Sequence, residues 1–344
     1  MRIALTADPE IAVPPILYGG IERVIDMLAR GLSARGHEVT LFARAGSTCP
    51  VETCVWPGAD SGAWLDTARN AAFLARHVRA RRFDMVHSFS RLAYLAPVLG
   101  ARVPKLMTYQ RAISPRTTGR AQRLARGTLE FSAISRKMME PVAHIGRWHM
   151  APNGAPLSAY AFRPDCAPDA PLAFLGRVEE IKGPHVAIEV ARRAGRRLVI
   201  AGNVPDEHRA WFQAHVAPAI DGEAVRYVGP VDDRAKNELL GAAAALLMPI
   251  SWEEPFGIVM AEAMACGAPV VGFRRGAVPE VVAHGVTGFV VDTLDEMAAA
   301  VARLPEIDRA ACRARVESLY SDDAVAERYL EIYRDMIARM RRER

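Results

Sequence analysis

A pair of glutamates frames a glycine in the second half of the chain. Glu254 stands three residues before Gly257, and Glu262 stands five residues after it. An apolar run typical of a strand precedes the pair and a helical pattern follows, so we expect Gly257 to begin a helix at the carboxyl end of a strand. The free amides near Phe256, Gly257 and Ile258 would then form an anion site.

Carboxylates beside an anion site are unfavourable unless they accept hydrogen bonds from neutral hydroxyls of the same ligand. A sugar esterified to a nucleoside diphosphate carries both kinds of group, so this segment predicts a nucleotide-sugar site. In the alternative interpretation Glu254 is a helix-dipole acid and Glu262 faces solvent. That alternative does not explain why both glutamates flank one strand-to-helix turn.

Two cations follow another predicted strand, over residues 171–175. Arg177 and Lys182 would supply fixed positive charge to a departing diphosphate, where negative charge develops. Alternatively they are surface cations paired with Glu179 and Glu180.

Two glycines, Gly19 and Gly20, lie between the first predicted strand and the first predicted helix. Without a Cβ, their backbone amides could approach a phosphate at the positive end of the helix. The alternative is that they only close a tight turn.

These candidates all follow strands of a repeating pattern. Strands are predicted over residues 2–7, 38–43, 84–88, 104–109 and 130–135, and then over 171–175, 197–201, 224–228, 244–249, 269–273 and 288–291. Helical patterns separate them, which predicts two successive α/β domains with parallel sheets. Ligands of such sheets bind at the carboxyl ends of the strands. Five prolines and an Asn-Gly pair indicate an interdomain linker within 151–171.

Composition agrees with a folded chain of about two domains. Of 344 residues, 51% are hydrophobic and 24% are charged, which excludes a disordered or fibrous protein. No run approaches the roughly 20 apolar residues that cross a bilayer, and no basic-then-apolar leader is visible. The five cysteines lack a CxxC pair. We therefore expect reduced thiols, no metal site and a cytoplasmic location.

Charge is unevenly distributed along the chain. Residues 1–163 hold 22 basic and 11 acidic side chains, whereas residues 164–344 hold 22 and 28. The first half should therefore attract anions, unless its arginines are simply scattered and solvated. Because no nucleic-acid-binding signature accompanies them, nucleic acid is not an expected partner.

Four motifs in order resemble glycosyltransferase family 4. They are Y-G-G-x-E at 18–22, G-H-E-V-T-L at 36–41, G-R-x-E-x-x-K-G at 176–183 and E-P-F-G-x-x-x-x-E at 254–262, joined by Asn153-Gly154. The resemblance implies a GT-B fold of two Rossmann-like domains facing a cleft. It places the domains at 1–160 on the acceptor side and 161–322 on the nucleotide-sugar side, with a helix over 323–344 that returns to the first domain.

The resemblance also implies roles for individual residues. Glu254 would contact donor-sugar hydroxyls, Glu262 the ribose, and Arg177 and Lys182 the diphosphate. Gly19 and Gly20 would lie near the diphosphate and the acceptor. No metal or other cofactor is implied.

One position departs from the family pattern. Many members carry a histidine at the end of the strand that corresponds to 104–109, where it touches the donor sugar, but this chain has Gln110. An amide can bind a sugar hydroxyl but cannot carry a proton, so Gln110 weakens any proposal of acid-base chemistry there.

The turn after strand 224–228 corresponds to the one that receives the nucleobase in the family. It contains Val231, Asp233 and Lys236. Asp233 could accept from N1–H and the 2-amino group of guanine while Lys236 donates to O6, whereas uracil matches this pair less well. The alternative makes Asp232 a helix N-cap and Asp233 a first-turn acid. The prediction leans to a GDP-sugar, with a UDP-sugar close behind.

The acceptor side is expected to be basic. Residues 102–137 hold nine cations and one acid, among them Arg111, Arg120 and Arg123. An anionic or lipid-linked acceptor and peripheral association with the inner membrane face are therefore predicted, with solvated helix surface as the alternative. His87, after strand 84–88, is a further cleft-edge candidate unless it is a satisfied structural histidine.

Together these features predict a retaining glycosyltransferase that moves a sugar from a nucleoside diphosphate to an acceptor hydroxyl in glycan, glycolipid or polysaccharide synthesis. Two alternatives remain. One is a sugar-nucleotide epimerase of the same fold, and the other is a donor-binding scaffold without transfer activity.

Overall fold

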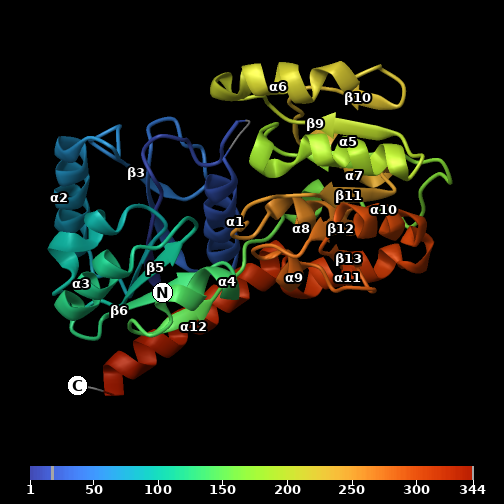
Figure 1. Ribbon diagram of the computed structural model, residues 1–344. Helices are drawn as coiled ribbons and strands as arrows, with labels where there is room; N and C mark the ends of the chain where they lie inside the picture. The colour runs from blue at the N-terminus through green and yellow to red at the C-terminus, as the bar shows by residue number, and fades with distance from the viewer. Residues whose placement is uncertain (17–18, 343–344) are drawn as a thin grey trace. The chain divides into compact units, whose positions relative to one another are not determined.

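The chain folds into two compact units (Figure 1). A computed structural model describes residues 1–16 and 19–342, so Tyr18 of the first motif lies outside the described residues. Unit 1 comprises Met1–Asn153 and the C-terminal segment from Asp322 onward, and unit 2 comprises Gly154–Ser321. The chain thus leaves unit 1 at Asn153, next to Gly154 of the predicted Asn-Gly junction.

Unit 1 is built on a parallel sheet of seven strands in the order β3-β2-β1-β4-β5-β6-β7. Its strands are β1 (Arg2–Thr6), β2 (Glu38–Ala43), β3 (Glu52–Val55), β4 (Met85–Ser88), β5 (Lys105–Tyr109), β6 (Leu129–Ala133) and β7 (Trp148–Met150). Its α-helices are α1 (Gly20–Ala34), α2 (Trp64–Ala80), α3 (Pro115–Ala125), α4 (Arg136–Met139) and α12 (Asp322–Arg342). The strand order reverses between β1 and β4, which is where open α/β sheets bind ligands.

Helix periodicity explains how α12 becomes part of unit 1. The apolar face of α1 includes Val24, Leu28 and Leu32, all buried. At Gly31 an added Cβ would lie 2.8 Å from the Cβ of Ala326 in α12, so the two helices approach closely. The apolar side chains of α12 are therefore buried within unit 1.

Unit 2 has a parallel sheet of six strands in the order β10-β9-β8-β11-β12-β13. Its strands are β8 (Leu172–Leu175), β9 (Leu198–Ala201), β10 (Val225–Tyr227), β11 (Ala245–Met248), β12 (Val270–Phe273) and β13 (Gly288–Val291). Its α-helices are α5 (Pro184–Arg193), α6 (Arg209–His215), α7 (Asp233–Ala242), α8 (Ile258–Ala265), α9 (Val278–Val281), α10 (Leu294–Ala302) and α11 (Arg309–Leu319). Here the order reverses between β8 and β11, the strands that precede the two strongest motifs.

The predicted pair of parallel Rossmann-like sheets is confirmed, with two strands that the sequence did not reveal. These strands are β3 and β7, which form the two edges of the unit 1 sheet. An edge strand needs no continuous apolar run because one of its sides pairs with no other strand. Accordingly, all three residues of β7 are only half-buried.

Candidate functional site

The candidate site of unit 2 lies at the reversal point of its sheet. Lys182 follows β8 and ends the short 3-10 helix Glu180–Lys182, whereas Glu254 follows β11. The Lys182 Nζ donates to Glu254 Oε2 at 2.6 Å. The fold therefore brings together two of the predicted site residues, which lie 72 residues apart in the sequence.

Trp252, which was not among the predicted site residues, completes this contact. Its indole Nε1 donates to the same Glu254 oxygen at 3.2 Å, and the Lys182 ammonium lies 4.5 Å from the centre of its ring. A cation over an indole face gains electrostatic attraction. The sequence signal that could have identified Trp252 is its position two residues before the candidate carboxylate Glu254. Trp252 lies beyond the end of β11, so the side-chain alternation of that strand does not predict that the Trp252 ring faces Lys182.

Glu254 retains one carboxylate oxygen for a ligand. Both donors share Oε2, and among the described residues Oε1 has no hydrogen-bond partner. The backbone of Glu254 is fixed, because its carbonyl accepts from the Ala277 amide at 2.8 Å. The side chain is 11% exposed, so the free oxygen lies in a largely desolvated setting.

Gly257 is the N-cap of α8, as predicted. Its φ of +75° lies in the left-handed region, and an added Cβ would lie 2.9 Å from Met260 Cε. The preceding Phe256 is buried, with its ring 5.5 Å from that of Tyr320. The start of α8, including Ile258, therefore holds its orphan amides at the carboxyl edge of the sheet.

Glu262 is buried inside α8 and also has one oxygen occupied. Its Oε1 accepts from Lys236 Nζ and from the Tyr160 hydroxyl, each at 2.6 Å. Among the described residues Oε2 has no hydrogen-bond partner. The solvent-facing alternative for Glu262 is therefore wrong, since only 5% of the residue is exposed. Tyr160, 102 residues away, had no recognisable signal in the sequence.

The turn after β10 differs from the predicted arrangement. Asp232 caps α7 by accepting from the Ala235 amide at 2.8 Å, which confirms the helix-cap alternative. Lys236 is not a free donor. It is 8% exposed, bridges Glu262 and Asp233 (3.2 Å), and lies over the Tyr160 ring. Val231, in the same turn, is partly exposed.

Arg177 is half-exposed after β8 and pairs with Glu179 at 2.8 Å. That partner was expected on the surface, but Glu179 is buried. The pairing of Arg177 with Glu179 in the alternative interpretation is therefore confirmed, but its surface location is wrong. Lys182 pairs with Glu254 instead, and Glu180 is exposed.

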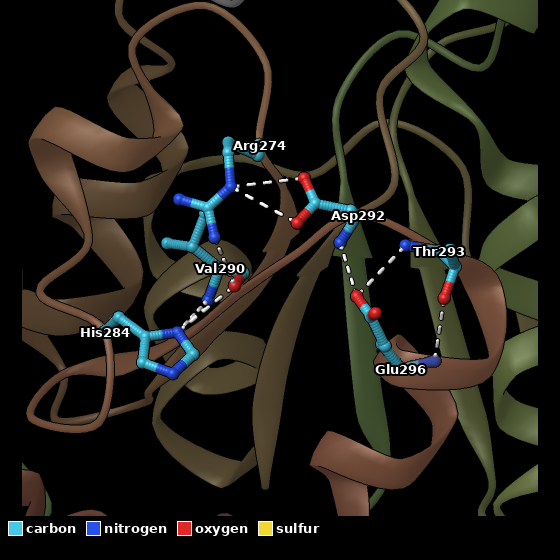
Figure 2. Close-up of polar contacts among 6 residues, drawn as sticks. All are labelled: Arg274, His284, Val290, Asp292, Thr293 and Glu296. Carbon is cyan, nitrogen blue, oxygen red and sulfur yellow. Dashed lines mark hydrogen bonds and ion pairs between the residues drawn. The ribbon is translucent and has the colours of Figure 1, made fainter.

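The same sheet edge continues to β12 and β13, where the charges satisfy each other. Figure 2 shows the Arg274 Nε donating to both oxygens of Asp292, at 3.1 and 3.3 Å. Glu296 accepts from the amides of Asp292 and Thr293, and the Thr293 hydroxyl accepts from the Glu296 amide, which forms a capping box at the start of α10 (Figure 2). These groups stabilise the scaffold.

Gln110 in unit 1 forms a closed amide pair. It exchanges two hydrogen bonds with Asn153, at 2.8 and 2.7 Å. The Gln110 amide therefore retains only one N–H and one lone pair for a ligand. Asn153 of the Asn-Gly junction thus fixes the side chain of Gln110, at the position where many members of the family carry a histidine.

The turn before α1 brings Gly20 to the start of that helix and Gly19 to its N-cap, with a φ of +150°. Near them are the carboxyls of Asp8 and Glu22, to which no role was assigned from the sequence, although Glu22 ends the first motif. Burial, together with the charge of Glu10, raises the pKa of Asp8 to about 6, and burial raises the pKa of Glu22. The position of Asp8 directly after the first strand was the available signal.

His87 is a structural residue. It is fully buried, its Nδ1 contacts the Tyr333 hydroxyl at 2.5 Å, and its Nε2 contacts Thr108 Oγ1 at 2.6 Å. Burial holds its pKa well below the ordinary value. The expectation of an acceptor-side His87 is therefore wrong, because both ring nitrogens are occupied by unit 1 itself.

The basic stretch divides into surface and interior residues. Arg111, Arg120 and Arg123 are exposed, the last two on α3. Lys105 is fully buried, where its Nζ donates to the Ala101 and Val103 carbonyls and burial lowers its pKa to about 7. The single acid, Glu130, is buried and ion-paired.

Metal and membrane features can be stated for the described part of the chain. No group of three or more His, Cys, Asp and Glu side chains within 1–16 and 19–342 is arranged to hold a metal ion. In the same ranges no helix has both the length and the apolar character needed to cross a membrane.

Two family models match successive parts of the chain. Residues 18–158 match the model described as Glycosyltransferase Family 4, and residues 168–316 match Glycosyl transferases group 1. Together they cover most of both units.

Curated relatives include a D-inositol 3-phosphate glycosyltransferase of Xylanimonas cellulosilytica, 28% identical over 81% of each chain. Glycogen synthase of Mycobacterium tuberculosis is 27% identical over 92% of this chain and 86% of that protein. A D-inositol 3-phosphate glycosyltransferase of Pseudarthrobacter chlorophenolicus is 33% identical, but the alignment spans 46% of this chain and 42% of that protein.

Solved structures share the whole fold. AviGT4, a glycosyltransferase involved in avilamycin A biosynthesis, has a TM-score of 0.73 and 25% identity over 98% of each chain. Sucrose-phosphate synthase of Thermosynechococcus elongatus has a TM-score of 0.76 at 22% identity over 98% of this chain and 99% of that one.

Proposed function

Because the chain belongs to glycosyltransferase family 4 and has the GT-B fold, we propose that it is a retaining enzyme that transfers a sugar from a nucleoside diphosphate to an acceptor hydroxyl. The observation that carries the proposal is the shared geometry of Glu254 and Glu262. Each carboxylate has one oxygen held by two protein donors and one left for a ligand. The start of α8 lies between them along the chain.

In this proposal the free oxygen of Glu254 accepts from sugar hydroxyls and that of Glu262 from the ribose. HepE of Anabaena, which shares the fold, was solved in complex with UDP-glucose, and this supports a sugar nucleotide as the ligand class. Phe256 sets the start of α8, whose amides receive the diphosphate.

Catalysis then consists of positioning and charge stabilisation. The bond from the sugar C1 to the diphosphate oxygen breaks while a bond to the acceptor oxygen forms on the same face. The proton of the acceptor hydroxyl passes to the leaving diphosphate, so that no side chain is required as base. Arg177, Lys182 and the start of α8 stabilise the charge that develops on the diphosphate.

We propose that the donor is GDP- or UDP-linked and that no metal or other cofactor is needed. Recognition of guanine by Asp233 and Lys236 would require Lys236 to reach the base while it holds Glu262. Calorimetry with GDP and UDP separates the bases. Tighter UDP binding, or GDP binding unchanged in Asp233→Ala, contradicts guanine recognition.

The acceptor is proposed to be anionic or lipid-linked, bound by a cytoplasmic enzyme at the inner membrane face. The exposed arginines of α3 support this, since basic residues near an anionic bilayer contribute about 1 kcal/mol each. Charge reversal of Arg120 and Arg123 should weaken acceptor binding or sedimentation with anionic vesicles. Binding that depends on neither salt nor these charges contradicts the proposal.

Incubation with labelled GDP- and UDP-sugars tests the proposed reaction. Transfer to an acceptor, or slow hydrolysis of the donor with retention at C1, supports it. An epimerised donor identifies the epimerase alternative, and tight binding with neither product identifies the scaffold. Either result overturns the proposed transfer.

A further inference from the structure

We infer that Glu179 is a positioning residue that orients Arg177 toward the donor diphosphate, with His208 as its second support. This inference rests on the proposed function, because it assumes that Arg177 meets the diphosphate. It assigns a role to a buried glutamate that contributes no ligand contact of its own.

The first observation is the burial of the Glu179 carboxylate. Only 3% of the residue is exposed, although it lies in a connection that follows a strand. A buried carboxylate loses hydration worth several kcal/mol unless cations or donors face it. Its retention at this position therefore requires partners.

The partners come from two different connections. Oε1 of Glu179 lies 2.8 Å from Arg177 Nη2, within the connection after β8, and this contact is an ion pair without hydrogen-bond geometry. Oε2 lies 3.2 Å from Nε2 of His208, in the 3-10 helix Asp206–His208 after β9. Glu179 thus links the connections that follow two neighbouring strands.

The backbones of these two connections are already joined. The Val178 amide donates to the Asn203 carbonyl at 2.9 Å, and the Gly176 amide donates to Ala201 at 3.1 Å. The residues on both sides of Arg177 are therefore fixed. Only the long Arg177 side chain still needs an anchor, and Glu179 supplies it.

Arg177 remains available on its other side. Its side chain is 37% exposed, and within the described ranges no carboxylate other than Glu179 forms an ion pair with it. A guanidinium held on one side by a single carboxylate can present N–H groups on its other side to a phosphate with less loss of side-chain entropy. Exposed Glu180 is the adjacent carboxylate without this geometry, and it provides a matched control.

The test is a double-mutant cycle of Arg177→Ala and Glu179→Gln, with Glu180→Gln as control. Glu179→Gln should lower kcat about 10-fold while the KM for the donor changes less than about 3-fold, because orientation matters most as charge develops. In the Arg177→Ala background, Glu179→Gln should change kcat less than about 2-fold. Glu180→Gln should match the wild type.

Calorimetric binding of GDP and UDP gives a second readout, and thermal unfolding reports stability. If Arg177→Ala alone leaves kcat and nucleotide affinity unchanged, the proposed role of Arg177 fails. The inference about Glu179 is overturned if Arg177→Ala lowers kcat but Glu179→Gln alone has the kcat of the wild type. It is also overturned if Glu179→Gln lowers kcat by the same factor in the Arg177→Ala background as in the wild type.

Should Glu179→Gln lower the melting temperature strongly, His208→Asn replaces it in the cycle. This variant keeps the Arg177–Glu179 pair and removes only the second support. It should lower kcat about 3-fold, and again only when Arg177 is present. Additive losses overturn the inference in this arm as well.

Discussion

At the scale of single residues, the candidate site depends on how carboxylate oxygens are shared. Lys182 and Trp252 both donate to Oε2 of Glu254, which leaves Oε1 for a ligand. Glu262 repeats the arrangement with Lys236 and Tyr160. Concentrating protein donors on one oxygen fixes each carboxylate and leaves the other oxygen without a protein donor, and the proposed function has this oxygen accept from substrate hydroxyls.

We expect Glu254→Gln and Lys182→Ala each to lower kcat about 100- to 1000-fold, because each removes a preorganised charge from the site. Both positions lie in connections after strands, so the fold should remain intact, although the melting temperature should fall because each change leaves one partner of the largely buried Lys182–Glu254 pair without its counter-charge. Steady-state kinetics with a verified donor and acceptor measure the effect. Gln110→Ala should lose less than either, and wild-type rates in both variants would contradict the assigned site.

Trp252→Phe should lower turnover about 10-fold, since it removes the N–H that donates to Glu254 but keeps an aromatic face for Lys182. Nucleotide titration monitored by intrinsic fluorescence should also lose most of its amplitude in this variant. Trp64→Phe is the control, because Trp64 is 75% exposed on α2 of unit 1. An unchanged fluorescence response would place the nucleotide away from Trp252.

At the scale of elements, the sequence predicted those features of the helices and strands that local residue types determine. Gly257 was expected to begin a helix, and it is the N-cap of α8. The edge strands β3 and β7 were missed because half-buried strands have no apolar run. Tyr160 was missed as a partner of Glu262, and Glu179 was expected only as a surface partner of Arg177. The contacts of Tyr160 with Glu262 and of Glu179 with His208 join separate segments of the chain, which no local pattern encodes.

The connection after β12 should control the position of Glu254. Gly276 has a φ of +53°, and an added Cβ would lie 2.2 Å from the Glu254 carbonyl oxygen. Gly276→Ala must therefore displace the backbone that carries Glu254, and we expect kcat to fall at least about 10-fold. Gly285→Ala has a similar φ of +75° but no atom within 4 Å of the added Cβ. If kcat were equal in Gly276→Ala and Gly285→Ala, displacement of the Glu254 backbone would not explain the effect, because only the strain of a positive φ is common to both variants.

At the scale of the whole molecule, the chain leaves unit 1 at Asn153 and returns to it at Asp322. Unit 1 is therefore completed only when α12 docks. Arg339 of α12 reaches Glu130 of β6 at 2.7 Å, across 209 residues, and His149 of β7 contacts the same carboxylate. Burial raises the pKa of Glu130, but hydrogen bonds from His149 and Arg339 outweigh it and leave the pKa below the usual 4.5.

Glu130→Gln should lower the free energy of unfolding by about 3 kcal/mol at pH 7, because it leaves Arg339 without its buried partner. A depressed carboxyl pKa contributes stability above the unfolded value of 4.5 and loses it as pH falls through the folded value. The difference from wild type should therefore persist from pH 7 to 5 and shrink below pH 4.5. Urea unfolding at pH 7, 5 and 3.5 measures this, with exposed Glu140→Gln as the control. A difference that stays constant down to pH 3.5 would mean that the charge of Glu130 does not hold α12 in place.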